Sequence, residues 1–267
     1  MTVATVKLLA IVTGIVSFGY ILFGGFLLRR YEGIGVRSLS LFSVLWGARY
    51  LLSSLVFYVL ATQGITGAAG LRPEALPDTT LINLLINLEP ILSALLTVSG
   101  IFAWLWFVLR YTRRIGSREK LAVAAIGGAT FVLSTLSGVV GARASSGQLG
   151  IDPMLRSSII RFGGVVEVLG SGVAVGVGIA LLYSTASNHQ PFSERAVAGL
   201  TVPIVFPWLV GYLYQFGLVT QFKWVSTLRG ITLAVGIVGL WLTVTEYNLF
   251  EQLPASRAVG RQTAFNS

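Results

Sequence analysis

The sequence predicts an all-α membrane protein: a bundle of seven transmembrane helices with its N-terminus outside the cell and its C-terminus in the cytoplasm. Seven apolar stretches are each longer than the roughly 20 residues that a helix, rising about 1.5 Å per residue, needs to cross a hydrocarbon core of about 30 Å. Hydrophobic residues make up 54% of the 267 residues and charged residues 11%, whereas soluble domains carry about 25% charged residues. The stretches are apolar all round and lack the alternation of barrel strands, so helices are expected.

The expected spans cover most of the chain, at residues 8–28, 40–60, 84–108, 121–142, 158–183, 197–219 and 224–248. The first is too long for a removable signal peptide and lacks a small-residue cleavage site, so it should be retained as a helix. The longest connection, residues 61–82, is rich in Gly, Pro, Thr and Ala and should be an external loop with at most one short helical turn at 73–75. We therefore expect residues 1–249 to form one transmembrane domain and residues 250–267 to form a cytoplasmic tail or linker.

Two later spans carry small residues or prolines. The fifth contains a GxxxG pair, Gly172 and Gly176, with further glycines on either side. Small residues let helix backbones approach closely in lipid, either inside one bundle or at the seam of a homodimer. The sixth contains Pro203 and Pro207, which remove backbone donors and should kink the helix.

The distribution of basic residues predicts the orientation. Eleven of the 19 Lys and Arg residues fall in the 1–2, 3–4 and 5–6 loops and the tail, five fall on the other side, and three lie within spans. The positive-inside bias therefore places the C-terminus in the cytoplasm. The pI near 10.3 does not indicate a nucleic-acid partner, because the basic residues flank membrane spans. The expected environment is the lipid bilayer of the cell membrane, crossed several times.

Charged residues inside the spans are the candidate ligand-binding or ion-pair residues: Arg49, Glu89, Arg161, Glu167 and Arg229. A charge at the bilayer centre costs about 2.5–3.5 kcal/mol, so it normally faces the bundle and finds a partner. At about 1.5 Å per residue, Glu89, Arg161 and Arg229 lie roughly 6–10 Å deep and Glu167 about 15 Å. We expect a polar pocket or ion-pair cluster open to the outside. The alternative is that Arg161 and Arg229 only extend to the outer interface, which Arg49 and Glu167 are too deep to do.

Several kinds of chemistry lack their residues. The chain has no cysteine and one histidine, so we expect no disulfide and no metal centre built on several His or Cys side chains. The three lysines, Lys7, Lys120 and Lys223, lie outside the middle of the last span, where a retinal Schiff base would form. GxSxG, HExxH and P-loop patterns are absent from the sequence. We therefore expect no catalytic residue, no metal and no cofactor.

Aromatic and basic residues follow one another at the end of the third span. Aromatic rings prefer the headgroup level, and arginines there should meet anionic lipid phosphates or a cytoplasmic partner. The expected anchors at the inner interface are Trp104, Trp106, Arg110, Tyr111, Arg113 and Arg114.

The same passage, AWLWFVLRYTRR at 103–114, resembles the W-x-x-F-x-L-x-Y-T-G-R stretch in the N-terminal seven-transmembrane region of histidine kinases, except that Arg113 replaces the glycine. The tail FEQLPASRAVGR at 250–261 resembles the juncture that leads into a cytoplasmic PAS or kinase domain. The resemblance implies a membrane-embedded sensor that relays a stimulus through its last helix to a cytoplasmic partner or a missing domain. Neither a phosphoacceptor helix nor an ATP-binding domain fits after residue 248, so we expect no kinase activity. The alternatives are a small secondary transporter or channel using the intramembrane Arg and Glu residues, or a scaffold without a ligand.

Overall fold

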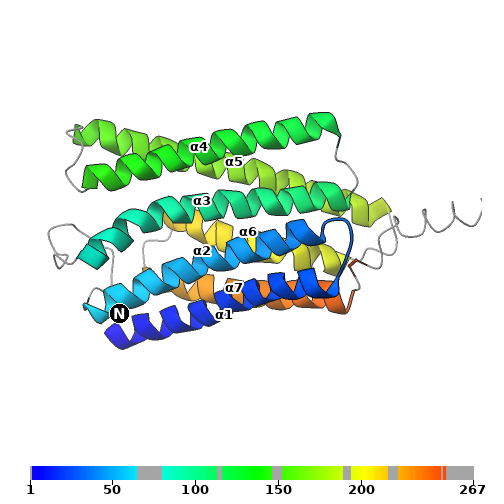
Figure 1. The fold of residues 1–267 in the computed structure, drawn as a ribbon, viewed down its shortest axis with the longest axis horizontal. Coiled ribbons are helices and arrows are strands. Elements are labelled where there is room, and N and C mark those ends of the chain that lie inside the picture. Colours follow the sequence, from blue (N-terminus) through cyan, green and yellow to red (C-terminus); the bar gives the residue numbers. More distant parts are fainter. Residues whose placement is uncertain are drawn as a thin grey trace, which may run out of the picture.

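The computed structural model describes residues 2–64, 80–112, 116–145, 152–188, 194–215, 222–247 and 249–250, and this part of the chain contains helices and no strand. The helices are α1 (Val3–Arg30), α2 (Val36–Thr62), α3 (Thr80–Tyr111), α4 (Ser117–Ser145), α5 (Pro153–Asn188), α6 (Glu194–Gln215) and α7 (Phe222–Thr245). They run side by side in one elongated bundle (Figure 1).

Neighbours in sequence are neighbours in space. Each helix packs on the next, α7 packs back on α1, and α3 contacts α2, α4 and α5. Because the chain reverses at every connection, the N-terminus lies at one end of the bundle and the α1–α2 connection lies at the other (Figure 1). We call these the N-terminal end and the opposite end.

All seven predicted spans overlap helices, and α1 to α5 are longer than the apolar stretches that they contain. Six are long and apolar enough to cross a membrane, over Val3–Arg30, Val36–Thr62, Ile91–Tyr111, Ser117–Val140, Arg161–Ser187 and Thr227–Thr245. Residues 216–219 of the sixth predicted span lie outside the described part of the chain, and α7 ends at Thr245, three residues before the predicted end. The predicted turn at 73–75 lies outside the described residues.

The outer surface of the bundle is apolar. In the most apolar segment of α4 only 17% of the residues are buried, compared with 50% in that of α3. Large side chains such as Leu8, Leu121 and Leu169 are exposed. Soluble proteins rarely expose continuous apolar surface of this extent, so the helices indicate a lipid bilayer environment and a multi-pass membrane protein.

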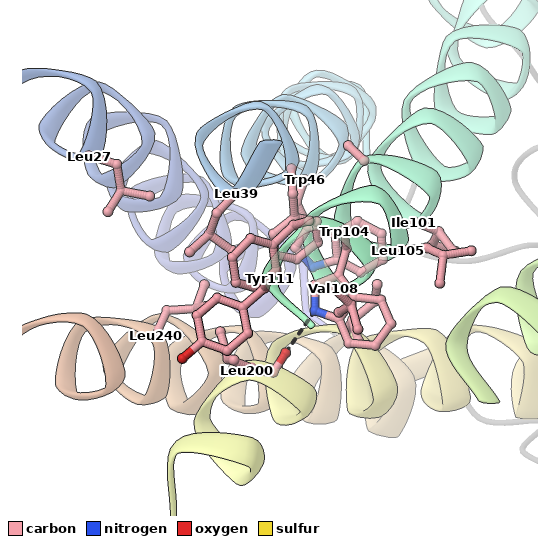
Figure 2. Packing of buried hydrophobic residues seen from close by; sticks show 14 of the residues in the cluster. Leu27, Leu39, Trp46, Ile101, Trp104, Leu105, Val108, Tyr111, Leu200 and Leu240 are labelled. Carbon is pink, nitrogen blue, oxygen red and sulfur yellow. Dashed lines mark hydrogen bonds between the residues drawn. The ribbon is translucent and has the colours of Figure 1, made fainter. Parts of the chain in front are cut away.

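The core is built around the aromatic side chains of α3 and its neighbours. Trp46, Trp104, Phe107, Tyr20 and Phe42 are almost completely buried, and the cluster links α1, α2, α3, α5, α6 and α7 (Figure 2). Two of them also bond the backbone of distant helices. The Trp104 indole Nε1 donates to the Leu200 carbonyl at 3.0 Å, and the Tyr20 hydroxyl donates to the Leu233 carbonyl at 3.1 Å.

Glycines allow two helix pairs to pack backbone against backbone. A Cβ added at Gly47 of α2 would lie 2.6 Å from the Ser17 carbonyl oxygen of α1. On the other side of the bundle, a Cβ added at Gly199 of α6 would lie 2.7 Å from the Gly239 carbonyl oxygen of α7. No side chain fits at these positions, so α1 with α2 and α6 with α7 form two closely packed hairpins.

The glycines of α5 mostly serve packing inside the bundle. A Cβ at Gly170 would clash with Thr130 of α4, and one at Gly178 would clash with the Trp104 ring. Gly172 lies against Trp208 of α6, 3.5 Å from the added Cβ, whereas nothing lies within 4 Å of a Cβ at Gly176. Pro203 and Pro207 are accommodated within one continuous helix, α6.

Candidate functional site

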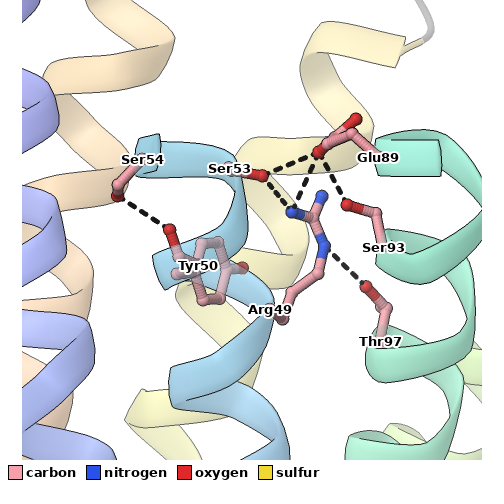
Figure 3. A network of polar contacts seen from close by, with 7 residues as sticks. All are labelled: Arg49, Tyr50, Ser53, Ser54, Glu89, Ser93 and Thr97. Carbon is pink, nitrogen blue, oxygen red and sulfur yellow. Dashed lines mark hydrogen bonds and ion pairs between the residues drawn. The ribbon is translucent and has the colours of Figure 1, made fainter. Parts of the chain in front are cut away.

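A polar network centred on Arg49 joins α2 to α3 (Figure 3). The Arg49 Nε donates to the Thr97 Oγ1 at 3.1 Å, and one of its terminal nitrogens donates to the Ser53 Oγ. That same nitrogen lies 3.5 Å from the Glu89 Oε1, and the two side chains are only 17% and 24% exposed. The charge of Arg49 is therefore neutralised within the bundle by a carboxylate on the neighbouring helix.

Two serines complete the surroundings of the Glu89 carboxylate. The Ser53 hydroxyl donates to the Glu89 Oε1 at 2.8 Å, and the Ser93 hydroxyl donates to the same oxygen at 2.6 Å. Ser53 lies four residues after Arg49, and Ser93 lies four residues after Glu89, so each serine shares a helix face with the charge it serves. Hydrogen bonds to a charged group contribute about 1.5–3 kcal/mol each, which helps to offset the cost of removing these charges from water.

Tyr50 extends the network to α7. Two guanidinium groups lie near its ring, with the Arg49 Cζ at 5.5 Å and the Arg229 Cζ at 5.8 Å from the ring centroid. The ring itself is buried, and the Ser54 hydroxyl donates to the Tyr50 carbonyl at 2.7 Å. A cation over an aromatic face is attracted by the ring quadrupole, so one tyrosine holds positive charges from α2 and α7 together.

A second polar cluster links α5 to α6. The Tyr212 hydroxyl donates to the Glu167 Oε1 at 3.4 Å and lies 3.1 Å from the Ser171 Oγ. The Trp208 indole donates to the same Ser171 oxygen at 3.0 Å. The Tyr212 hydroxyl therefore ties the Glu167 carboxylate of α5 to α6.

Four of the five candidate charges predicted from the sequence take part in these clusters. Arg49 and Glu89 form an ion pair, Arg229 contacts the Tyr50 ring, and Glu167 bonds Tyr212. Arg161 is exposed on α5, which fits the alternative that it extends to the interface.

The sequence reasoning missed the uncharged members: Tyr50, Ser53, Ser93, Thr97, Ser171, Trp208 and Tyr212. For two of them a signal was present, because Ser53 and Ser93 each follow a buried charge by four residues. The ring of Tyr50 adjoins Arg49 in sequence, but its contact with Arg229 depends on how α2 and α7 pack.

The predicted belt of interface anchors divides into two groups. Trp106 and Arg110 are the outward members, with the Arg110 Cζ 5.7 Å from the Trp106 ring centroid. Trp104 is fully buried, and Tyr111 is 7% exposed, so the expectation of headgroup contact does not hold for these two side chains. They face inward because α3 is the central helix and both find backbone carbonyls there. Arg113 and Arg114 lie outside the part of the chain that the structure describes.

Half-buried charge is confined to one part of the bundle. Arg49, Glu89, Glu167 and Arg229 all lie between mid-helix and the N-terminal end, whereas every charged side chain described at the opposite end is exposed. Buried hydroxyls in that opposite half, such as those of Ser40, Ser43 and Thr243, bond backbone carbonyls. The polar network therefore does not continue as a charged path to the opposite end among the described residues.

The described residues contain no group of three or more His, Cys, Asp or Glu side chains that could hold a metal ion. No protein family model, curated protein or solved structure matches the chain. The four charges of the site sum to zero and lie among several hydroxyls, so the helices can repack when one charge is protonated or pairs with a ligand instead.

Proposed function

We propose that the chain is a seven-span sensory domain, with its N-terminus outside and its C-terminus in the cytoplasm, that relays the state of the Arg49 network to the end of α7. Six helices are long and apolar enough to span the membrane, and we add α6 to them because it packs between α5 and α7 along the bundle. The similarity of the 103–114 passage to the membrane region of histidine kinases supports the same function, as does the similarity of the 250–261 passage to the juncture that leads into a cytoplasmic domain.

The observation that carries the proposal is the one-sided placement of buried charge. A transporter needs a polar route that reaches both ends of the bundle, whereas a sensor needs only a site that responds from one side. Among the half-buried charges, Arg49 and Glu167 lie nearest the middle of the bundle. Beyond them towards the opposite end, the core is closed by Trp104, Phe107 and Leu240, which are fully buried.

One cluster of buried side chains extends from Tyr50 of the network to Leu249, after the end of α7. The Trp46 ring contacts the Tyr50 ring at a centroid distance of 5.4 Å and packs on α3 at Gly100. Farther along α3, the Phe107 and Tyr111 centroids lie 5.5 Å apart, and the Tyr111 hydroxyl donates to the Leu249 carbonyl at 3.3 Å. Close-packed side chains of this kind switch between discrete arrangements rather than deforming smoothly, so a change at Arg49 can reach the residues after α7.

The absence of cysteine from the sequence makes the test direct. Spin labels on introduced cysteines at Thr112 and Thr245 report the distance between the ends of α3 and α7. Neutralising the network with Arg49→Gln and Glu89→Gln should shift the mean distance by about 1–2 Å, the usual size of helix shifts in switching proteins. The control, Arg161→Gln, removes an exposed charge and should leave the distance unchanged.

An unchanged distance in folded, neutralised protein contradicts the proposal, and Glu167→Gln gives a second variant if the double substitution fails to fold. The transporter alternative has its own measurement. If the unmodified protein carries protons or ions across a liposome membrane, and Glu167→Gln abolishes the flux, transport replaces sensing as the function.

A further inference from the structure

The structure carries a second feature, unrelated to the Arg49 network: a lateral groove between α2, α3 and α4 at the opposite end of the bundle. The groove has a volume of about 410 Å³ and is lined mainly by apolar side chains, among them Leu41, Leu45, Phe102, Trp106 and Phe131. Within a bilayer, a groove of this kind can hold a hydrocarbon chain, because it offers almost no polar group. Gly127 and Gly128 line its α4 side and leave room where other residues would fill it.

A charged cavity lies at the same end of the bundle as the groove. It has a volume of about 650 Å³ and is lined by the α1–α2 connection together with Arg37 and Arg110. Glu32 is the one acidic residue in its lining, and all three charged side chains are exposed. The cavity therefore carries net positive charge and remains accessible from outside the bundle.

The helices themselves connect the two cavities. On α2, Arg37 of the charged cavity lies four and eight residues before Leu41 and Leu45 of the groove, so the three side chains share one face. On α3, Arg110 lies over the ring of Trp106, at 5.7 Å, and Trp106 lines the groove. On α2 and on α3, a row of side chains along one helix face thus begins with an arginine in the charged cavity and continues with apolar side chains in the groove.

The backbone adds a second attraction for an anion at the same place. The residue before α2, Gly35, has φ 90° and no side chain to cap the helix, and the first turn of α2 contains no acidic residue. The amide groups at a helix N-terminus carry partial positive charge and favour phosphate. Val36, the first residue of α2, lines the charged cavity.

We propose that this groove and cavity bind one phospholipid with a net negative headgroup, its phosphate between Arg37 and Arg110 and one acyl chain against Leu41, Leu45 and Phe102. From residue 110 to residue 98 of α3, the cavity and the groove together extend about 18 Å, comparable with the hydrocarbon depth of one leaflet, about 15 Å. Net positive charge and the basic rows select an anionic headgroup over a zwitterionic one. The site stands independently of the proposed sensory function.

The test measures lipids retained by the purified full-length protein, counted by native mass spectrometry after adding phosphatidylglycerol, phosphatidylcholine or phosphatidylethanolamine. The unmodified protein should retain one phosphatidylglycerol in preference to the two zwitterionic lipids. Arg37→Gln with Arg110→Gln should weaken its retention about 30-fold, from the usual contribution of a basic residue near an anionic lipid. The matched control is Arg29→Gln with Arg30→Gln, which removes equal charge at the same end from two exposed residues outside the cavity.

A second pair of variants tests the acyl chain. A Cβ at Gly128 or at Gly176 meets no atom within 4 Å, so both positions accept a larger side chain, but only Gly128 lines the groove. Gly128→Leu should release the lipid, and Gly176→Leu should not.

Four outcomes overturn the proposal: equal losses in both arginine pairs, unchanged retention in Gly128→Leu, equal retention of the zwitterionic lipids, or displacement of the lipid by inorganic phosphate. Arg37→Gln alone provides a milder variant if the double substitution unfolds the protein.

Discussion

The Arg49–Glu89 ion pair gives the most quantitative test of the structure. Its two side chains are 17% and 24% exposed, so the pair lies between exposed pairs, which contribute about 0–1 kcal/mol, and fully buried pairs, whose loss of one partner costs about 3–5 kcal/mol. We expect Arg49→Gln and Glu89→Gln each to lower the free energy of unfolding by about 2 kcal/mol. The glutamine at position 89 still offers an oxygen to the hydroxyls of Ser53 and Ser93, so the loss comes mainly from the unpaired charge.

The double variant should cost about 2 kcal/mol rather than the sum of the single losses, because neither partner then leaves a charge uncompensated. The measurement is reversible unfolding in mixed detergent micelles, followed by circular dichroism, for the unmodified protein, the two single variants and the double variant. Arg161→Gln, an exposed charge, should change the unfolding free energy by less than about 0.5 kcal/mol. A coupling energy below about 0.5 kcal/mol between Arg49 and Glu89 would refute the reasoning.

Three further predictions concern packing, the end of α7 and orientation. Gly47→Ala forces a methyl group against the α1 backbone and should lower the unfolding free energy by about 1–3 kcal/mol. The control Gly176→Ala should leave the unfolding free energy nearly unchanged. Equal melting temperatures of the two variants would contradict the close α1–α2 contact. Tyr111→Phe removes a hydrogen bond contributing about 1 kcal/mol and should speed proteolysis of the chain after α7 without loss of helix content, so an unchanged cleavage rate counts against that contact. A membrane-impermeant maleimide should label Thr2→Cys in intact cells and Thr112→Cys only after permeabilisation, and the reverse pattern would invert the proposed orientation.

The fold was predictable because the apolar stretches are long and are separated by polar connections. Length and apolarity determine where a helix can cross lipid, and these are local properties of the sequence. The ends of the helices were less predictable. Polar residues such as those after 183 in α5 continue the helix to Asn188, since an α-helix satisfies its own backbone hydrogen bonds whether or not its side chains lie in lipid.

The candidate site was predictable only in its charges. A buried charge needs a partner, so Arg49 and Glu89 could be selected from the sequence, but their pairing depends on the rotation of α2 against α3. The inward position of Trp104 illustrates the same limit. Its indole and its position beside arginines are typical of an interface anchor, yet α3 is central in the bundle and the ring is 0% exposed.

The close contact of Gly199 with Gly239 restricts how α7 can move. A piston stroke of α7 alone would drag one backbone across another where no side chain separates them. We therefore expect α6 and α7 to move together as one rigid pair. Any movement of α7 would then also move the start of α6 at Glu194, which lies at the same end of the bundle as the end of α7.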